Sequence, residues 1–152
     1  MRGISTDNRG AALVEFAIVV LLLLTLVLGI IEFGLLMKDY LLLNHAAREG
    51  ARSAALGSPT SAVISRVQSS SPTLSQARLT ITLEKRAMGA SPSPWGALGD
   101  TSDGLHNDAA QGDEVRAYLT YSHQLATGSF FSWIFGGGTS VDIHGDMIMR
   151  RE

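Results

Sequence analysis

Two carboxylates interrupt an otherwise apolar stretch near the start of the chain. The segment between Arg9 and Lys38 reads GAALVEFAIVVLLLLTLVLGIIEFGLLM, and its only charged residues are Glu15 and Glu32. An isolated carboxylate near the middle of the bilayer costs roughly 2.5–3.5 kcal/mol on insertion scales, and such residues usually serve a function. Because a buried charge is tolerated when an opposite charge pairs with it, we expect such a carboxylate to form an ion pair.

The apolar stretch predicts a single membrane-spanning helix over residues 11–37. Its uncharged centre, residues 16–31, measures about 24 Å as a helix, slightly short of a hydrocarbon layer of about 30 Å. Glu15 and Glu32 then lie toward opposite interfaces, and Glu32, near Lys38, needs no special role. A cleaved secretory signal is disfavoured, since the apolar run is too long and no small-residue cleavage site follows it.

Composition limits the remaining functions. The 152 residues fit one small domain plus a membrane segment, and the net charge of −2 offers no basic face for nucleic acid. Cysteine is absent, which excludes disulfides and thiolate metal sites. The chain contains no Walker, Rossmann, HExxH or GxSxG motif, and its four histidines lack ligand spacing. We therefore expect neither an enzyme nor a cofactor-binding protein.

The start of the apolar stretch resembles a known processing signature. Residues 10–16 (GAALVEF) are similar to the type IV prepilin site, with glycine before the cut and glutamate at the fifth mature position. Phenylalanine at the sixth position is the variant associated with Flp pilins and TadE-like pseudopilins. The wider block RGAALVEFAIV…LGIIEFG…LNHAAREGARSAALG resembles the TadE-like family, as do residues 112–116 and the final MRRE. Residues 58–111 carry no such resemblance.

The resemblance implies a function in the tight-adherence system. The chain would be a minor pseudopilin, cut between Gly10 and Ala11 by a prepilin peptidase, that helps assemble an adhesive Flp-type pilus or a related secretion machine. Glu15 and Phe16 would dock subunits, with the Glu15 carboxylate pairing with the new Ala11 amine of a neighbour. The implied partners are the membrane, the peptidase, other pilins or pseudopilins and the assembly platform. Taken without its context, Glu15 is also compatible with a protonated or interface-directed carboxylate.

The implied organisation is a cytoplasmic leader at 1–10, a transmembrane helix at 11–37 and an extracytoplasmic pilin-like head at 38–152. Counts of Lys and Arg on the two flanks do not settle this orientation, which rests partly on the resemblance. Entry into the fibre and retention in the membrane both stay open. The alternative function is an uncleaved single-pass anchor whose extracytoplasmic head binds an envelope partner.

Helical character continues beyond the membrane to Leu56 and ends before Ser58-Pro59. Spacing of i, i+4 and i+7 predicts one buried face, made of Leu36, Tyr40, Leu43, Ala47, Ala51 and Ala54. The charged residues lie away from that face, namely Lys38, Asp39, Arg48, Glu49 and Arg52. Glu49 and Arg52 are spaced to pair. We expect the alanines to pack on the head's own sheet, although they also suit an intersubunit contact.

The rest of the head predicts an α+β fold. A second helix over 59–69 follows Ser58 as its N-cap, with proline at the first helical position. Alternating apolar residues predict three strands, at 78–85, 114–122 and 140–150, with Gly145 at a possible bulge. We therefore expect an antiparallel sheet of about three strands against the long helix.

Two long loops complete the chain. Residues 89–112 are rich in turn formers, and a metal site is conceivable there at four polar residues, Asp100, Asp103, His106 and Asp108. Their spacing does not fit an EF-hand, so a solvated acidic loop without a metal is favoured. Residues 125–138 hold clustered aromatics, and the candidate membrane or partner contacts are Phe130, Phe131, Trp133 and Phe135. Folding back to close the core is an equally good interpretation.

Overall fold

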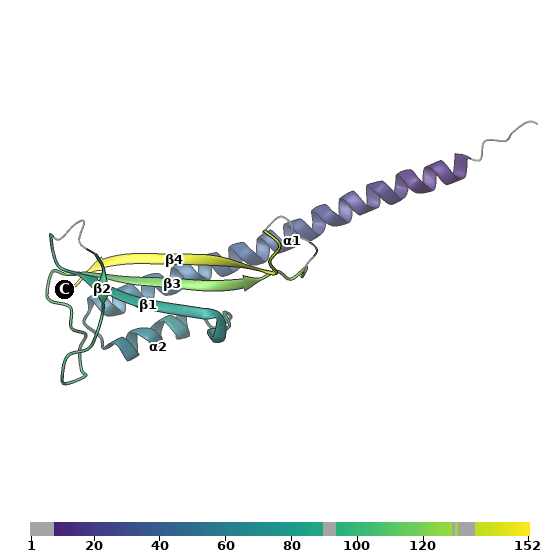
Figure 1. Cartoon of the computed structure of the whole chain (residues 1–152). Coiled ribbons are helices and arrows are strands. Elements are labelled where there is room, and N and C mark those ends of the chain that lie inside the picture. Colours follow the sequence, from purple (N-terminus) through teal and green to yellow (C-terminus); the bar gives the residue numbers. More distant parts are fainter. Residues whose placement is uncertain (1–7, 90–93, 129, 131–135) are drawn as a thin grey trace, which may run out of the picture. The chain divides into compact units, whose positions relative to one another are not determined.

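A computed structural model of the chain describes residues 8–89, 94–128, 130 and 136–152. Its helices are α1 (Asn8–Ala55), α2 (Thr60–Ser70) and the short 3-10 helix η1 (Gln76–Arg78), and its strands are β1 (Leu79–Arg86), β2 (Gly96–Ala97), β3 (Glu114–Gln124) and β4 (Ser140–Arg150) (Figure 1). The chain divides into two compact units, residues 1–35 and 36–152. The second unit, called the head below, contains the end of α1 and everything after it.

The head is built on one antiparallel sheet with the strand order β2-β1-β3-β4. The central strand β3 pairs with β4 along its whole length, from Glu114↔Arg150 to Gln124↔Ser140. Every second residue of β3 is buried, so the strand has one core face and one outer face. These features confirm the α+β class and the three predicted strands. The short strand β2 adds a fourth, and it lies inside the segment predicted to be only a loop.

The helices of the head cover one face of the sheet (Figure 1). The alanines of α1 are almost fully buried there, confirming that this face packs on the head's own sheet: Ala46, Ala47, Ala51, Ala54 and Ala55. Small side chains let the helix approach closely. At Gly50, a Cβ atom would lie 2.5 Å from Cγ2 of Val67, so glycine is also what allows α2 to pack against α1.

Glycine has the same use in the sheet. Gly145 pairs with Leu119 in an uninterrupted register, so the predicted bulge is absent. A Cβ atom at Gly145 would lie 3.1 Å from both the backbone oxygen and Cγ of Leu43 on α1. The strand needs glycine because its backbone rests directly on the helix.

Two predicted positions on α1 are wrong. Tyr40 is 41% exposed and does not belong to the buried face, whereas Asp39, expected on the polar face, is buried. Asp39 lies four residues before Leu43, which places both on the same side of the helix. A hydrogen bond of 2.8 Å joins its Oδ2 to Nδ1 of His123 on β3. Burial of this acid is tolerated because a polar partner from the sheet meets it.

The start of α2 also differs from the prediction. Pro59, not Ser58, is the N-cap, with extended backbone angles (φ −62°, ψ 154°), and the helix has no capping side chain of its own next to it. Instead, the Asp100 carboxylate accepts hydrogen bonds from the Thr60 N–H at 2.6 Å and the Thr60 hydroxyl at 2.8 Å. A residue 40 positions away thus satisfies the first turn of α2.

The end of α1 is fixed by a glycine turn. Gly57 has φ +85°, its N–H donates to the Ala54 carbonyl at 2.9 Å, and the Ser58 N–H donates to the Ser53 carbonyl at 3.2 Å. This pattern is a Schellman motif, which requires the left-handed backbone that glycine adopts most easily.

Two distant residues then bind the carbonyls at the end of α1. The buried Asn107 side chain donates to the carbonyls of Ala54 (2.8 Å) and Ser58 (2.9 Å). The Arg151 guanidinium donates to the Ala55 carbonyl at 3.2 Å, where a positive charge also complements the helix dipole. The acidic loop and the C-terminal segment are thereby tied to the same helix end.

Candidate functional site

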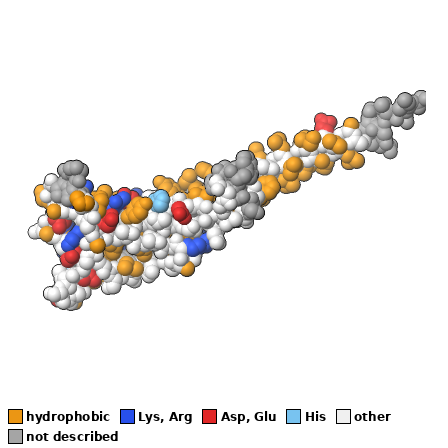
Figure 2. All heavy atoms as spheres, viewed as in Figure 1, with side chains coloured by type: hydrophobic (Ala, Val, Ile, Leu, Met, Phe, Trp, Pro, Cys, Tyr) orange, Lys and Arg blue, Asp and Glu red, His pale blue; other side chains and the backbone are white. Residues whose placement is uncertain are grey.

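The first candidate site lies at the start of α1, in the first unit. Residues Gly10 to Phe16 are helical and exposed, and Phe16 exposes 66% of its surface. The large apolar side chains that follow are also exposed, with Leu22 at 72%. Figure 2 shows apolar side chains along this segment of the helix.

This segment is long and apolar enough to cross a membrane. An 18-residue window within Gly10–Ala55 has a mean hydropathy of 3.0, and none of the window is buried. Its polar side chain Thr25 donates to the Leu21 carbonyl at 2.8 Å, so the hydroxyl is satisfied within the helix. An apolar surface of this extent is stable only against lipid or another protein.

Contacts among the described residues do not explain Gly10 and Glu15. A Cβ atom at Gly10 would meet no atom within 4 Å, so packing does not require glycine there. Among the described residues, Glu15 has no ion-pair or hydrogen-bond partner, and its carboxylate lies one helical turn after Ala11. The structure therefore presents a glycine, a following alanine and an exposed carboxylate on consecutive turns of one apolar helix.

The aromatic segment is only partly described. Phe130 is 49% exposed. The other candidate contacts, Phe131, Trp133 and Phe135, lie outside the described residues. Both interpretations of this segment therefore stay predictions.

The acidic loop has a structural function in the head. Leu98 and Ala109 from this loop are buried in the core with Val115 and Val63, which the low apolar content did not predict. The polar residues do not converge, and within the described ranges no three His, Cys, Asp or Glu side chains are arranged to hold a metal ion.

Each carboxylate of the loop has its own local partners. Asp108 accepts from Lys85 Nζ at 2.7 Å and from the Gly99 N–H at 2.8 Å, and the Lys85 hydrogen bond is the main cause that lowers the Asp108 pKa. Hydrogen bonds from the Thr101 hydroxyl and the Leu105 N–H lower the pKa of Asp103. The acids therefore order the loop, in addition to Asp100 capping α2.

Comparison with known families gives one finding. Residues 10–52 match the family described as TadE-like protein. Over these residues the chain is similar to TadE-like proteins. The match confirms the resemblance inferred from GAALVEF and the block that follows. No curated protein and no solved structure matches the chain.

The TadE-like range covers the exposed apolar helix and most of the part of α1 that packs in the head. Both Gly10 and Glu15 lie inside it, whereas the acidic loop and Phe130 lie outside. The site with the strongest support is therefore the start of α1.

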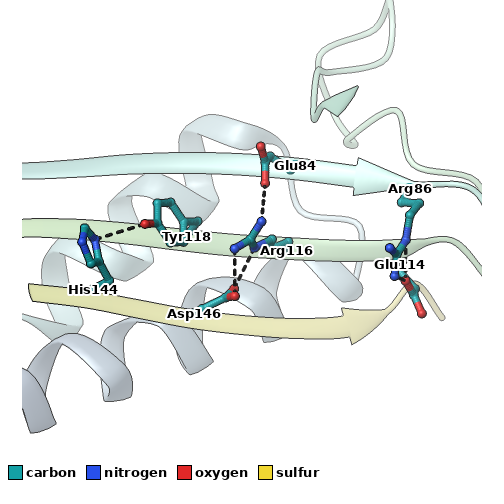
Figure 3. A network of polar contacts seen from close by, with 7 residues as sticks. All are labelled: Glu84, Arg86, Glu114, Arg116, Tyr118, His144 and Asp146. Atoms are coloured by element: carbon teal, nitrogen blue, oxygen red, sulfur yellow. Dashed lines mark hydrogen bonds and ion pairs between the residues drawn. The ribbon is translucent and has the colours of Figure 1, made fainter. Parts of the chain in front are cut away.

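Outside the TadE-like range, the outer face of the sheet carries a polar network (Figure 3). Arg116 on β3 donates to Asp146 on β4 through two bonds of 2.9 Å and to Glu84 on β1 at 3.3 Å. The hydrogen bond to Asp146 is the main cause that raises the Arg116 pKa. Arg86 on β1 also pairs with a carboxylate of β3: its Nε donates a hydrogen bond of 2.9 Å to Glu114.

Aromatic rings complete this outer face. The centre of the Trp95 ring lies 4.4 Å from Cζ of the Arg86 guanidinium, and the Tyr118 hydroxyl lies 3.1 Å from Nδ1 of His144. The network pairs charges across strands and so stabilises the sheet. In the sequence, the polar residues that alternate with apolar ones along each strand predict a polar outer face. Which of these residues pair with one another follows only from the strand register.

Proposed function

We propose that this chain is a minor pseudopilin of the tight-adherence system, which takes part in assembling a Flp-type pilus or a related secretion machine. It is made as a membrane-anchored precursor, and a prepilin peptidase cuts it between Gly10 and Ala11. The observation that carries this proposal is the GAALVEF site at the start of an uncovered apolar helix, within the range that matches TadE-like proteins. The chain catalyses no reaction; its leader is a substrate.

In the proposed arrangement, residues 1–10 are cytoplasmic, residues 11–37 span the membrane and residues 38–152 form the extracytoplasmic head. The core clusters of the head, which contain Leu43, Leu119 and Val115 among others, consist only of residues after 35. This supports a membrane segment that anchors the head without contributing to its core.

Glu15 and Phe16 are the proposed docking residues. Cleavage creates an amine on Ala11, and the Glu15 carboxylate of a neighbouring subunit pairs with that amine in the low-dielectric membrane, where a lone charge is costly. Two observations support the pairing: Glu15 has no partner among the described residues, and the adjacent Phe16 is exposed. Gly10 suits a peptidase pocket that excludes side chains, since no contact within the described part of the chain requires glycine there.

The first test is the N-terminus of the chain isolated from its host membrane. Mass spectrometry should find Ala11 as the first residue when the peptidase is active and Met1 when the peptidase gene is deleted. An intact Met1 in the presence of active peptidase would refute processing and favour the uncleaved anchor, the alternative function.

The second test is Glu15→Ala. This variant should still insert into the membrane, because it removes an unfavourable charge from an apolar helix, but pilus production should fall at least tenfold as an ion pair is lost. Leu22→Ala, at another exposed position of the same helix that carries no charge, is the matched control and should assemble normally. Normal pili from the Glu15→Ala variant would eliminate the pairing mechanism.

A further inference from the structure

We propose that a pocket between the end of α1 and α2 binds a carboxylate group with a single negative charge, carried on a short aliphatic stem. The pocket has a volume of about 240 Å³ and is lined by Glu49, Arg52, Ser53, Leu56, Ser58 and Arg66. It lies within the head and is independent of leader cleavage. Nothing in the proposed pseudopilin function uses it.

Two unpaired arginines are the main feature of this pocket. Across residues 8–89, 94–128, 130 and 136–152, no carboxylate lies within ion-pair distance of Arg52 or Arg66. The predicted Glu49–Arg52 pair is therefore not formed. On the outer sheet face, by contrast, Arg86 and Arg116 are both paired with carboxylates. Guanidinium groups left open at a pocket offer a ready site for an oxyanion, because their N–H groups form charge-assisted hydrogen bonds in a fixed fork.

The charge of the lining favours a monoanion. Two guanidinium groups and the Glu49 carboxylate give 2 − 1 = +1. A carboxylate neutralises this charge, whereas a phosphate dianion would leave an excess negative charge next to Glu49. Ser53 and Ser58 provide hydroxyls that donate to the remaining oxygen lone pairs.

The apolar side chain in the lining favours a short aliphatic stem on the ligand. Leu56 is 56% exposed and forms the apolar wall beside the charged groups. Burying methylene groups against it contributes roughly 0.8 kcal/mol each, which a bare inorganic anion does not gain. The ligand chemistry is therefore that of a glutamate side chain on a partner protein, or of a free short-chain carboxylic acid.

The test uses the full chain in detergent micelles and NMR at constant ionic strength, which follows the arginine Nε–Hε signals and the backbone amide signals of the lining residues, so that binding to the arginine variants is also measured. The probes are the peptide acetyl-Ala-Glu-Ala-amide, sodium butyrate and inorganic phosphate. Both carboxylates should shift the Arg52 and Arg66 signals saturably. Tighter binding of the peptide than of butyrate indicates a protein source for the carboxylate, and tighter binding of butyrate indicates a free acid.

Substitutions make the test specific to the pocket. Arg52→Gln or Arg66→Gln should weaken carboxylate binding on the order of tenfold, the loss expected for one charge-assisted hydrogen bond. Arg48→Gln is the control, because Arg48 is an exposed arginine of α1 outside the lining. Glu49→Gln raises the pocket charge to about +2 and should strengthen phosphate binding more than carboxylate binding. Amide spectra check that each variant is folded.

Three results would overturn the proposal. These are the absence of saturable shifts with either carboxylate, equal binding by the folded Arg52→Gln/Arg66→Gln double variant, and tighter binding of phosphate than of both carboxylates to the unsubstituted chain. None of them affects the cleavage test, so the pocket and the pseudopilin function fail separately.

Discussion

Asp108 connects the acidic loop to β1 through one partly exposed ion pair. Its carboxylate receives Lys85 Nζ on one oxygen and the Gly99 N–H on the other, and both lower its pKa below the ordinary value of 3.8. Because the unfolded chain holds the proton more tightly, the stabilisation by Asp108 is fully present above about pH 3.8. It is lost as the pH falls through the lower pKa of the folded state.

Asp108→Asn should therefore reduce the pH dependence of stability in the acidic range. The variant keeps an oxygen for the Gly99 N–H but loses the charge, so we expect a loss of less than about 1 kcal/mol at pH 7, since the pair is partly exposed. Between about pH 5 and pH 3, stability should fall less steeply than in the unsubstituted chain. Urea unfolding of the full chain, followed by tryptophan fluorescence at several pH values, measures both effects.

Asp142→Asn provides the matched control for this prediction. Asp142 is exposed on β4, and no ion pair or hydrogen bond of its side chain occurs within the described part of the chain. The same change of charge at this position should leave the dependence of the unfolding free energy on pH unaltered. An unchanged slope in Asp108→Asn, or an equal change in Asp142→Asn, would contradict the assigned role of the Asp108–Lys85 pair.

At the scale of elements, the head depends on backbones that approach closely. Gly145 brings β4 onto the Leu43 backbone, and Gly50 brings α1 onto Val67 of α2. Both contacts lie in the layer where the helices meet the sheet. A side chain added in this layer forces whole elements apart, since the obstructing atoms at Leu43 include rigid backbone.

Gly145→Ala should consequently destabilise the head by about 1–3 kcal/mol, the usual range for overpacking. Gly96→Ala on β2 is the control, because a Cβ atom there would meet only the Lys85 carbonyl at an ordinary 3.9 Å. Denaturant midpoints of the two variants provide the comparison. Equal stability of both variants would show that β4 can move away from α1 at no cost.

At the scale of the whole molecule, the chain combines an exposed apolar helix with a head that has its own buried hydrophobic clusters. The buried clusters contain Leu43, Val67 and Leu119 in one and Val63 and Val115 in the other, all within residues 36–152. The helix before Leu36 supplies none of these clustered core residues. Stability of the head and insertion into a membrane should therefore be separable properties.

A chain that begins at Leu36 should stay in the aqueous phase and keep the sheet signal in circular dichroism. The full chain should fractionate with membranes and require detergent for extraction, because its apolar helix is uncovered. Membrane fractionation together with circular dichroism checks both parts. Aggregation or loss of sheet in the shorter chain would show that the head needs the preceding helix.

Local pattern accounts for what the sequence alone determined. The apolar run, the GAALVEF site and the alternation along residues 114–122 and 140–150 are each properties of consecutive residues. The apolar run and the alternation predicted the long helix and the strands, since a periodicity of 3.6 or 2 residues already specifies a helical or strand face. The alanine face was predicted for the same reason. The GAALVEF site and the block after it gave the resemblance to the TadE-like family.

Only the tertiary structure decided which polar groups meet. Asp39 and His123 are 84 residues apart in sequence, and Asp100 lies 40 residues after the Thr60 that it caps. The pocket likewise joins Arg52 of α1 to Arg66 of α2. Helix and strand periodicity assigns a residue to a face, but it does not say which distant element covers that face. The polar partners, and the pocket that we propose as a carboxylate site, follow from how the elements pack.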